Sequence, residues 1–159
     1  MELFYCSRWW IKKKKAVDIL TEEEAKSRHD TGKVYTAVIT SDDKIAYVID
    51  ILKDYIILRY MDENINPYLI YEFHKVCEND IFLKGITYFG YEGEGEEFYI
   101  FNFSTDGTVS MEIKDNISNT MEERETTCDV SEQYGTFPKF GQYEDLLKIK
   151  PINPITVIN

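Results

Sequence analysis

The sequence predicts an α+β protein that is mostly β: an antiparallel meander sheet of seven to eight strands, one N-terminal helix and a short C-terminal helical turn. From residue 34 onward, apolar and polar residues alternate with a period of two, as in half-buried strands. Short polar turns separate these segments. Such turns join antiparallel neighbours, because a parallel crossover needs about a dozen residues or more. A helix signature precedes the first of these strands.

The strands follow one another at short intervals. The alternation is clearest after Pro67, which fits a strand start because proline has no backbone N–H. Consecutive strands that pair in order form a meander, which can curl into a barrel or half-barrel. Seven strands of the meander are expected over Val34–Thr40, Lys44–Leu52, Tyr55–Met61, Tyr68–Val76, Ile81–Tyr91, Phe98–Ser104 and Thr108–Lys114, and a long polar strand over Ile117–Val130 would be the eighth. Residues 2–11, ahead of the helix, are apolar and aromatic enough to form a strand as well.

Two helical segments flank the strands. Thr21 and Glu24 have the spacing of a capping box, and Gly32 supplies a helix end. His29 precedes that end, where a cation offsets the helix dipole. The segment Tyr143–Lys148 predicts a short helical turn. We expect one domain over residues 1–150 and a loosely held tail over 151–159, which has two prolines and no charge.

The chain is strongly acidic, with 18 basic and 29 acidic residues and a formal net charge of −11. Residues 1–15 are locally basic, so the remainder is more acidic still. A negative field repels phosphate backbones, which makes nucleic acid an unexpected partner. The same field speeds association with a basic protein. A requirement for solubility, without any basic partner, also explains the negative net charge.

The cysteines and apolar runs indicate the compartment. Three widely spaced cysteines, Cys6, Cys77 and Cys128, are not a disulfide framework. The first fifteen residues carry their positive charge after the apolar stretch, unlike a secretory signal, and no apolar run is long enough to span a bilayer. We therefore expect a cytoplasmic protein with no membrane partner.

Few residues offer catalytic or metal chemistry. His74 and Cys77 are spaced H-x-x-C beside Asp80, but positions 74 and 77 of one strand point to opposite faces. No nucleophile motif and no phosphate-binding loop occurs. With so many carboxylates, some acid–base pair always exists, so carboxylates alone do not predict an enzyme. We expect no cofactor, no metal and no catalytic residue.

Lys12–Lys15 form a basic cluster beside Trp9 and Trp10. Basic and aromatic residues together suit nucleic acid or an anionic membrane surface. We expect instead that the lysines solvate an edge strand, because they discourage edge-to-edge pairing.

The acidic turns are the candidate partner-binding site. Carboxylates next to tyrosines can bind Arg and Lys side chains of another protein. The alternative is that these turns are polar only because they are exposed to solvent. The candidate contacts are Glu92, Glu94, Glu96, Glu97 and Tyr91 on one loop, with Asp62 and Glu63 on another.

Residues 60–147 resemble a group of small bacterial immunity proteins, which neutralise polymorphic and contact-dependent toxins. The most specific part is the ending, an aromatic followed by Pro-x-Phe-Gly-x-Tyr, an acidic residue and Leu, as in Phe137–Leu147. The other segments that carry the resemblance are Pro67–Phe73, Ile81–Leu83, Tyr99–Phe103, Asp106–Val109, Glu122–Glu125 and Asp129–Ser131.

The resemblance implies a non-catalytic inhibitor that binds a basic toxin, such as a nuclease, through an acidic surface. It assigns no functional residue. Two alternatives remain open: a small-ligand-binding β-barrel with a tyrosine-lined cavity, and a hydrolase with two opposed carboxylates. The sequence leaves the oligomeric state undetermined.

Overall fold

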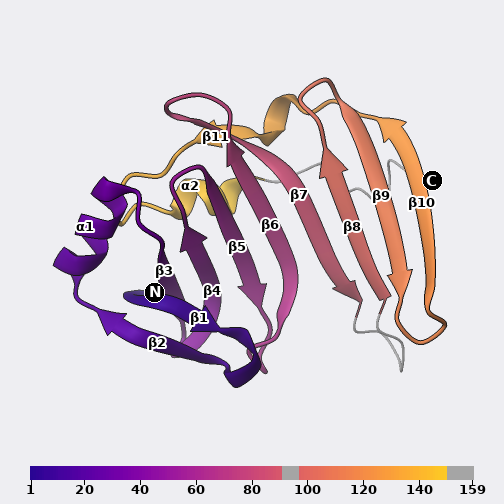
Figure 1. Ribbon diagram of the computed structural model, residues 1–159. Helices are drawn as coiled ribbons and strands as arrows, with labels where there is room; N and C mark the ends of the chain where they lie inside the picture. Colours follow the sequence, from indigo (N-terminus) through magenta and orange to yellow (C-terminus); the bar gives the residue numbers. More distant parts are fainter. Residues whose placement is uncertain (91–96, 150–159) are drawn as a thin grey trace. The chain divides into compact units, whose positions relative to one another are not determined.

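The structure, a computed structural model, describes residues 1–90 and 97–149. Its strands belong to one antiparallel sheet, in which each strand from β3 to β10 neighbours the next along the chain (Figure 1). Strand β1 lies between β2 and β3, and β11 pairs with β7. The mostly β, antiparallel meander with few helices is confirmed. The expected number of strands, seven to eight, is too low: the described residues form eleven.

The chain divides into two compact units, Met1–Ile70 and Tyr71–Asn159, and the boundary falls within β6. The strands of the first unit are β1 (Glu2–Trp10), β2 (Lys15–Leu20), β3 (Tyr35–Ser41), β4 (Lys44–Ile51) and β5 (Tyr55–Met61). Those of the second are β7 (Asp80–Gly90), β8 (Glu97–Phe103), β9 (Thr108–Asp115), β10 (Thr120–Thr127) and β11 (Tyr134–Thr136), while β6 (Pro67–Lys75) crosses the boundary.

The helix α1 (Glu22–Thr31) begins and ends as its sequence predicts. Thr21 Oγ1 accepts from the Glu24 backbone N–H at 3.2 Å, and the Glu24 carboxylate accepts from the Thr21 N–H at 2.8 Å. Gly32 closes the helix with φ +69°. His29 has a more specific role than offsetting the helix dipole: its Nδ1 is hydrogen-bonded to the Tyr35 hydroxyl at 2.9 Å.

The first unit has strands buried on both faces. On one face, Tyr35, Ala37, Ile49 and Leu58 have no exposed surface. On the other, Trp9 at the end of β1 packs in a cluster with Cys6, Val38, Val48 and Met61. Met61 belongs to β5, which is not a neighbour of β1 in the sheet. The end of the β1–β2 hairpin therefore packs against a face of the sheet of its own unit.

Strand β2 was missed because lysines occupy its start. The 3-10 turn η1 (Ile11–Lys13) and Lys14, with φ +51°, reverse the chain, so that Lys15 opens a strand paired only with β1. Of Lys12–Lys15, only Lys15 lies on an edge strand as expected; Lys12 and Lys13 are in η1, and Lys14 follows it. The polar strand over Ile117–Val130 is shorter than predicted, because the turn after β9 extends to Asn119, with φ +53°.

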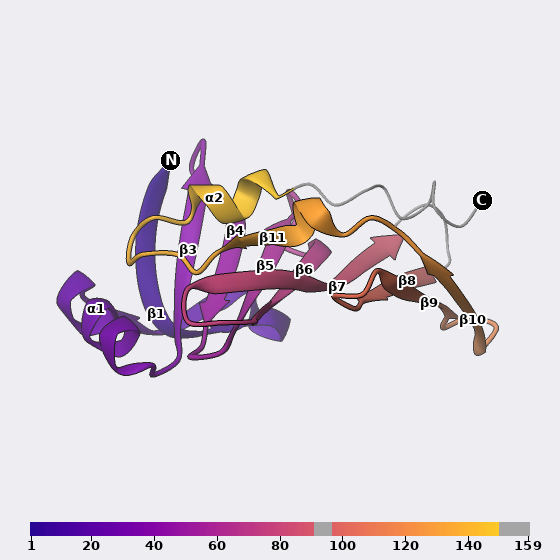
Figure 2. The ribbon, with the colours of Figure 1, turned by 90° about the horizontal axis from the view of Figure 1, so that it is seen from above.

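In the second unit, the segment after β10 returns along the sheet (Figure 2). It contains η2 (Ser131–Gln133), β11 and α2 (Glu144–Lys148). Buried Gln133 donates from Nε2 to the Leu83 carbonyl at 3.0 Å, and the Phe137 N–H donates to the Asn79 carbonyl at 2.7 Å. The short C-terminal helical turn is confirmed. The predicted tail, residues 151–159, lies outside the described residues.

Candidate functional site: an acidic face on strands β9 and β10

The β9–β10 hairpin lies at the edge of the second unit's sheet (Figure 1). Its two strands carry several carboxylates. Residues that pair directly across an antiparallel ladder share one face of the sheet. The register places Glu123 opposite Glu112 and Glu125 opposite Ser110. These three glutamates therefore project from the same side, and we call Glu112, Glu123 and Glu125 the acidic face.

An open hollow of about 270 Å³ lies over this part of the hairpin. Its lining residues are Ser110, Met111, Glu112, Glu123, Arg124 and Glu125. Met111 and Arg124, which also line it, pair with each other in the same ladder. The hollow is open, mostly polar and lined by all three glutamates. It lacks the enclosure and the tyrosine lining that the ligand-binding alternative requires.

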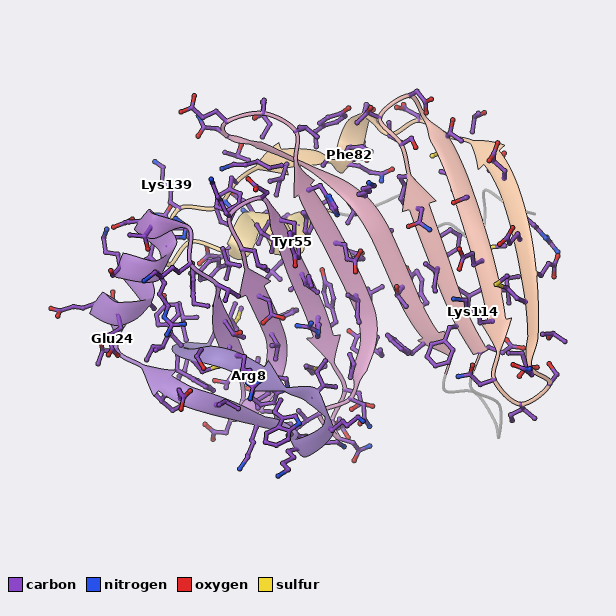
Figure 3. All side chains as sticks on the ribbon, viewed as in Figure 1. Arg8, Glu24, Tyr55, Phe82, Lys114 and Lys139 are labelled. Carbon is purple, nitrogen blue, oxygen red and sulfur yellow. The ribbon has the colours of Figure 1, made fainter. Side chains whose placement is uncertain are left out.

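Two facing glutamates are electrostatically unfavourable, because like charges directly opposite on a sheet repel each other. Lys114, labelled in Figure 3, offsets part of this repulsion: its Nζ is 3.4 Å from Glu112 Oε2. The lysine side chain is 43% exposed and that of Glu112 is 32% exposed, so solvent screens the pair. Within the described residues, Glu123 and Glu125 form no ion pair.

Apolar side chains continue the acidic face toward β7. The register places Ile100 beside Glu112, and Phe98 between Phe89 and Lys114. The Phe89 and Phe98 rings meet edge to face with centroids 5.1 Å apart. Met121, opposite Lys114, is 59% exposed. Aromatic and methionine side chains are enriched in protein–protein contacts, whereas carboxylates are depleted at their buried centre.

The turn between β9 and β10 holds a further carboxylate in its ionised form. Hydrogen bonds from the Ser118 side chain, followed by those from the backbone N–H groups of Ile117 and Ser118, hold the pKa of Asp115 below its ordinary value. The N–H of Ile117 donates to Asp115 Oδ1 at 2.9 Å. Asp115 thus adds a fixed negative charge to the hairpin while it shapes the turn.

The structure distributes the predicted contact residues over both units. Asp62 and Glu63 follow β5 in the first unit, where Asp62 Oδ1 accepts from the Asn64 and Asn66 N–H groups and Glu63 pairs with Lys44 at 3.5 Å. Glu97 opens β8 in the second unit and accepts from the Tyr99 hydroxyl at 2.7 Å. The remaining predicted contacts, Tyr91, Glu92, Glu94 and Glu96, lie outside the described residues.

No motif in the sequence singles out the acidic face. The alternation of Glu123 and Glu125 within one strand signals that they share a side. Their pairing with Ser110 and Glu112 depends on the four-residue turn between the strands, and no motif specifies its length. The acidic face therefore emerges only from the register.

The other candidate sites gain no support. The thiol of Cys77 donates to Asp80 Oδ2 at 2.9 Å. Among residues 1–90 and 97–149, no group of three or more His, Cys, Asp or Glu is placed to hold a metal ion. No helix in that part of the chain has the length and apolar character to cross a membrane. All three cysteines are free thiols.

Comparison of the chain with known protein families, with curated proteins and with solved structures finds no match.

Proposed function

We propose that this protein is an inhibitor of a basic bacterial toxin, which it binds through the acidic face. The observation that carries the proposal is the direct opposition of Glu112 and Glu123, beside Glu125, over an open hollow. The arrangement costs stability in the free protein, and a cationic partner would offset that cost. The resemblance of residues 60–147 to immunity proteins supports the same function.

The chemistry of the face suits arginine and lysine side chains. Carboxylates bind guanidinium and ammonium groups through charge-assisted hydrogen bonds, which are stronger than neutral ones. A net charge of −11 would steer a basic protein toward this surface and raise the association rate. The apolar residues beside the glutamates, Ile100, Phe98 and Met121, would supply the part of the contact that salt does not weaken.

The first experiment identifies the partner and then measures its affinity. The protein serves as bait in lysate of its own organism, at low and at high salt, and one stoichiometric basic protein released by salt is the expected result. With that protein purified, the dissociation constant is measured for wild type and for E112Q/E123Q/E125Q. We expect the dissociation constant of the variant to be much larger, because the substitutions remove three negative charges from the contact surface.

The control variant is E2Q/E78Q/E132Q. It changes the net charge by the same amount at three exposed positions that form no ion pair within the described residues. The control should change the association rate moderately and the dissociation rate little. Equal effects of the two variants would show that only net charge matters, and the acidic face would then be rejected as the contact.

A second set of variants tests the predicted loop contacts. Two charge-reversal variants test whether these residues also contact the partner. One reverses Glu92, Glu94, Glu96 and Glu97 together, and the other reverses Asp62 and Glu63 together. Protection of cells that express the partner then tests inhibition itself. A partner that binds tightly yet keeps its toxicity would contradict the inhibitor function and leave a binding module.

A further inference from the structure

The end of the β1–β2 hairpin, in the first unit, exposes large apolar side chains. Trp10 is 39% exposed and Ile11, which opens the η1 turn, is 43% exposed. Trp9, one residue earlier, is buried in the cluster beneath the hairpin. The chain thus buries one tryptophan as an anchor and presents the next to solvent.

Basic side chains surround these two residues. Lys13 Nζ lies 4.1 Å from the centroid of the Trp10 ring, and Arg8 Cζ lies 6.0 Å from it. Lys12, within the turn, and Lys15, at the start of β2, are also exposed. Within the described part of the chain, none of Arg8, Lys12, Lys13 and Lys15 forms an ion pair. We call Arg8, Trp10, Ile11, Lys12, Lys13 and Lys15 the hairpin tip; Figure 3 labels Arg8.

Lys14, which is not part of the hairpin tip, fixes the conformation of the tip. Lys14, in the left-handed conformation, donates from Nζ to the Asn64 carbonyl at 2.7 Å. The loop it contacts carries Asp62 and Glu63, whose carboxylates are engaged by backbone N–H groups and by Lys44. These two acidic residues therefore do not cancel the charge of the tip by pairing with it.

We propose that the hairpin tip docks the protein on an anionic membrane surface, with lysines against lipid phosphates and with Trp10 and Ile11 at the headgroup level. Tryptophan favours this interfacial region, and each Lys or Arg near an anionic surface adds attraction. The acidic remainder of the chain opposes binding weakly, because charges beyond about 8 Å are largely screened at physiological salt. This surface is distinct from the acidic face.

A lipid surface fits the tip better than a nucleic acid does. Binding to single strands uses aromatic rings as free platforms on which bases stack. Lys13 already covers a face of the Trp10 ring. Ile11, beside it, has no polar or stacking function but suits shallow insertion among headgroups.

The test uses vesicles of equal parts phosphatidylglycerol and phosphatidylcholine, with pure phosphatidylcholine for comparison. Wild type should sediment with the anionic vesicles only, and high salt should release it. K12Q/K13Q/K15Q should lower partitioning by about one hundredfold, because three surface charges are lost. The matched control K33Q/K53Q/K139Q removes three exposed lysines elsewhere and should leave partitioning within about twofold.

Tryptophan fluorescence locates the contact independently. The chain has two tryptophans, of which Trp9 is buried. The emission of wild type should shift to shorter wavelength on anionic vesicles and be quenched by brominated lipid, and W10F should lose both responses. Circular dichroism of each variant verifies that the fold is retained.

Three results would overturn the proposal: no partitioning of wild type, equal losses in the two triple-lysine variants, or displacement by a single-stranded oligonucleotide at micromolar concentration. The last would assign the tip to nucleic acid. The variant E112Q/E123Q/E125Q should still bind vesicles, so failure of the tip and failure of the acidic face are distinguishable.

Discussion

Arg59 donates from Nη1 to Asp50 Oδ2 at 2.5 Å, across two neighbouring strands of the first unit. The two side chains are only 10% and 20% exposed. The other oxygen of Asp50 accepts from the Thr36 hydroxyl at 2.6 Å, so both oxygens of the carboxylate are hydrogen-bonded. A charged group is thereby accommodated beside the apolar cluster of Trp9 and Cys6.

We predict that D50A destabilises the protein by about 3 kcal/mol, because it leaves the Arg59 charge largely buried without its partner. Chemical denaturation measures the loss. The control is D30A, which removes the exposed i,i+4 partner of Lys26 and should cost under about 1 kcal/mol. Similar losses for the two variants would mean that the Asp50–Arg59 pair behaves as a surface pair.

Gly107 is required in the β8–β9 turn for two reasons. Its φ is +90°, and an added Cβ would lie 2.7 Å from the Cys128 carbonyl oxygen. We predict that G107A costs more than about 2 kcal/mol, because backbone atoms must move to relieve the overlap. G32A, with φ +69°, would meet only the flexible Lys53 side chain at 3.2 Å and should cost about 1 kcal/mol. The reverse order of the two losses, measured by denaturation, would refute this account.

Burial raises the pKa of the Cys6 thiol from 9.0 to about 11, since it disfavours the thiolate, with a smaller contribution from the charge of Asp50. The unfolded chain therefore loses this proton at lower pH than the folded chain. The contribution to stability is complete below pH 9 and is lost as pH rises toward 11. We predict that wild type loses about 2 kcal/mol more than C6A over that window. Equal pH slopes for both proteins would contradict the prediction.

Local signals in the sequence specify much of this fold. Thr21, Glu24 and Gly32 define α1 to the residue, and Tyr55–Met61 forms the predicted strand with the predicted bounds. These elements depend on neighbours in the chain, which the sequence displays directly. The short strands β2 and β11 were missed because each is stabilised by its partner: Lys15 pairs with Trp10, and Gly135 with Ile81.

The candidate sites were harder to predict, because charge composition does not determine register. The count of carboxylates indicated an acidic surface but not that Glu112 faces Glu123, which requires the hairpin turn. The lysine cluster was visible in the sequence, yet the burial of Trp9 and the exposure of Trp10 depend on how the hairpin packs over its own sheet.

The opposed glutamates predict a trade between stability and binding. E123Q removes the repulsion with Glu112 and should raise the free energy of unfolding by about 0.2–1 kcal/mol. E125Q, whose partner across the ladder is the neutral Ser110, should change it little. Thermal and chemical denaturation of the free protein measure both. For the bound protein the prediction is reversed, because either substitution should weaken the complex with a basic partner. A loss of stability in E123Q would show that Lys114 already compensates both carboxylates, and the acidic face would then carry no unrelieved charge for a partner to neutralise.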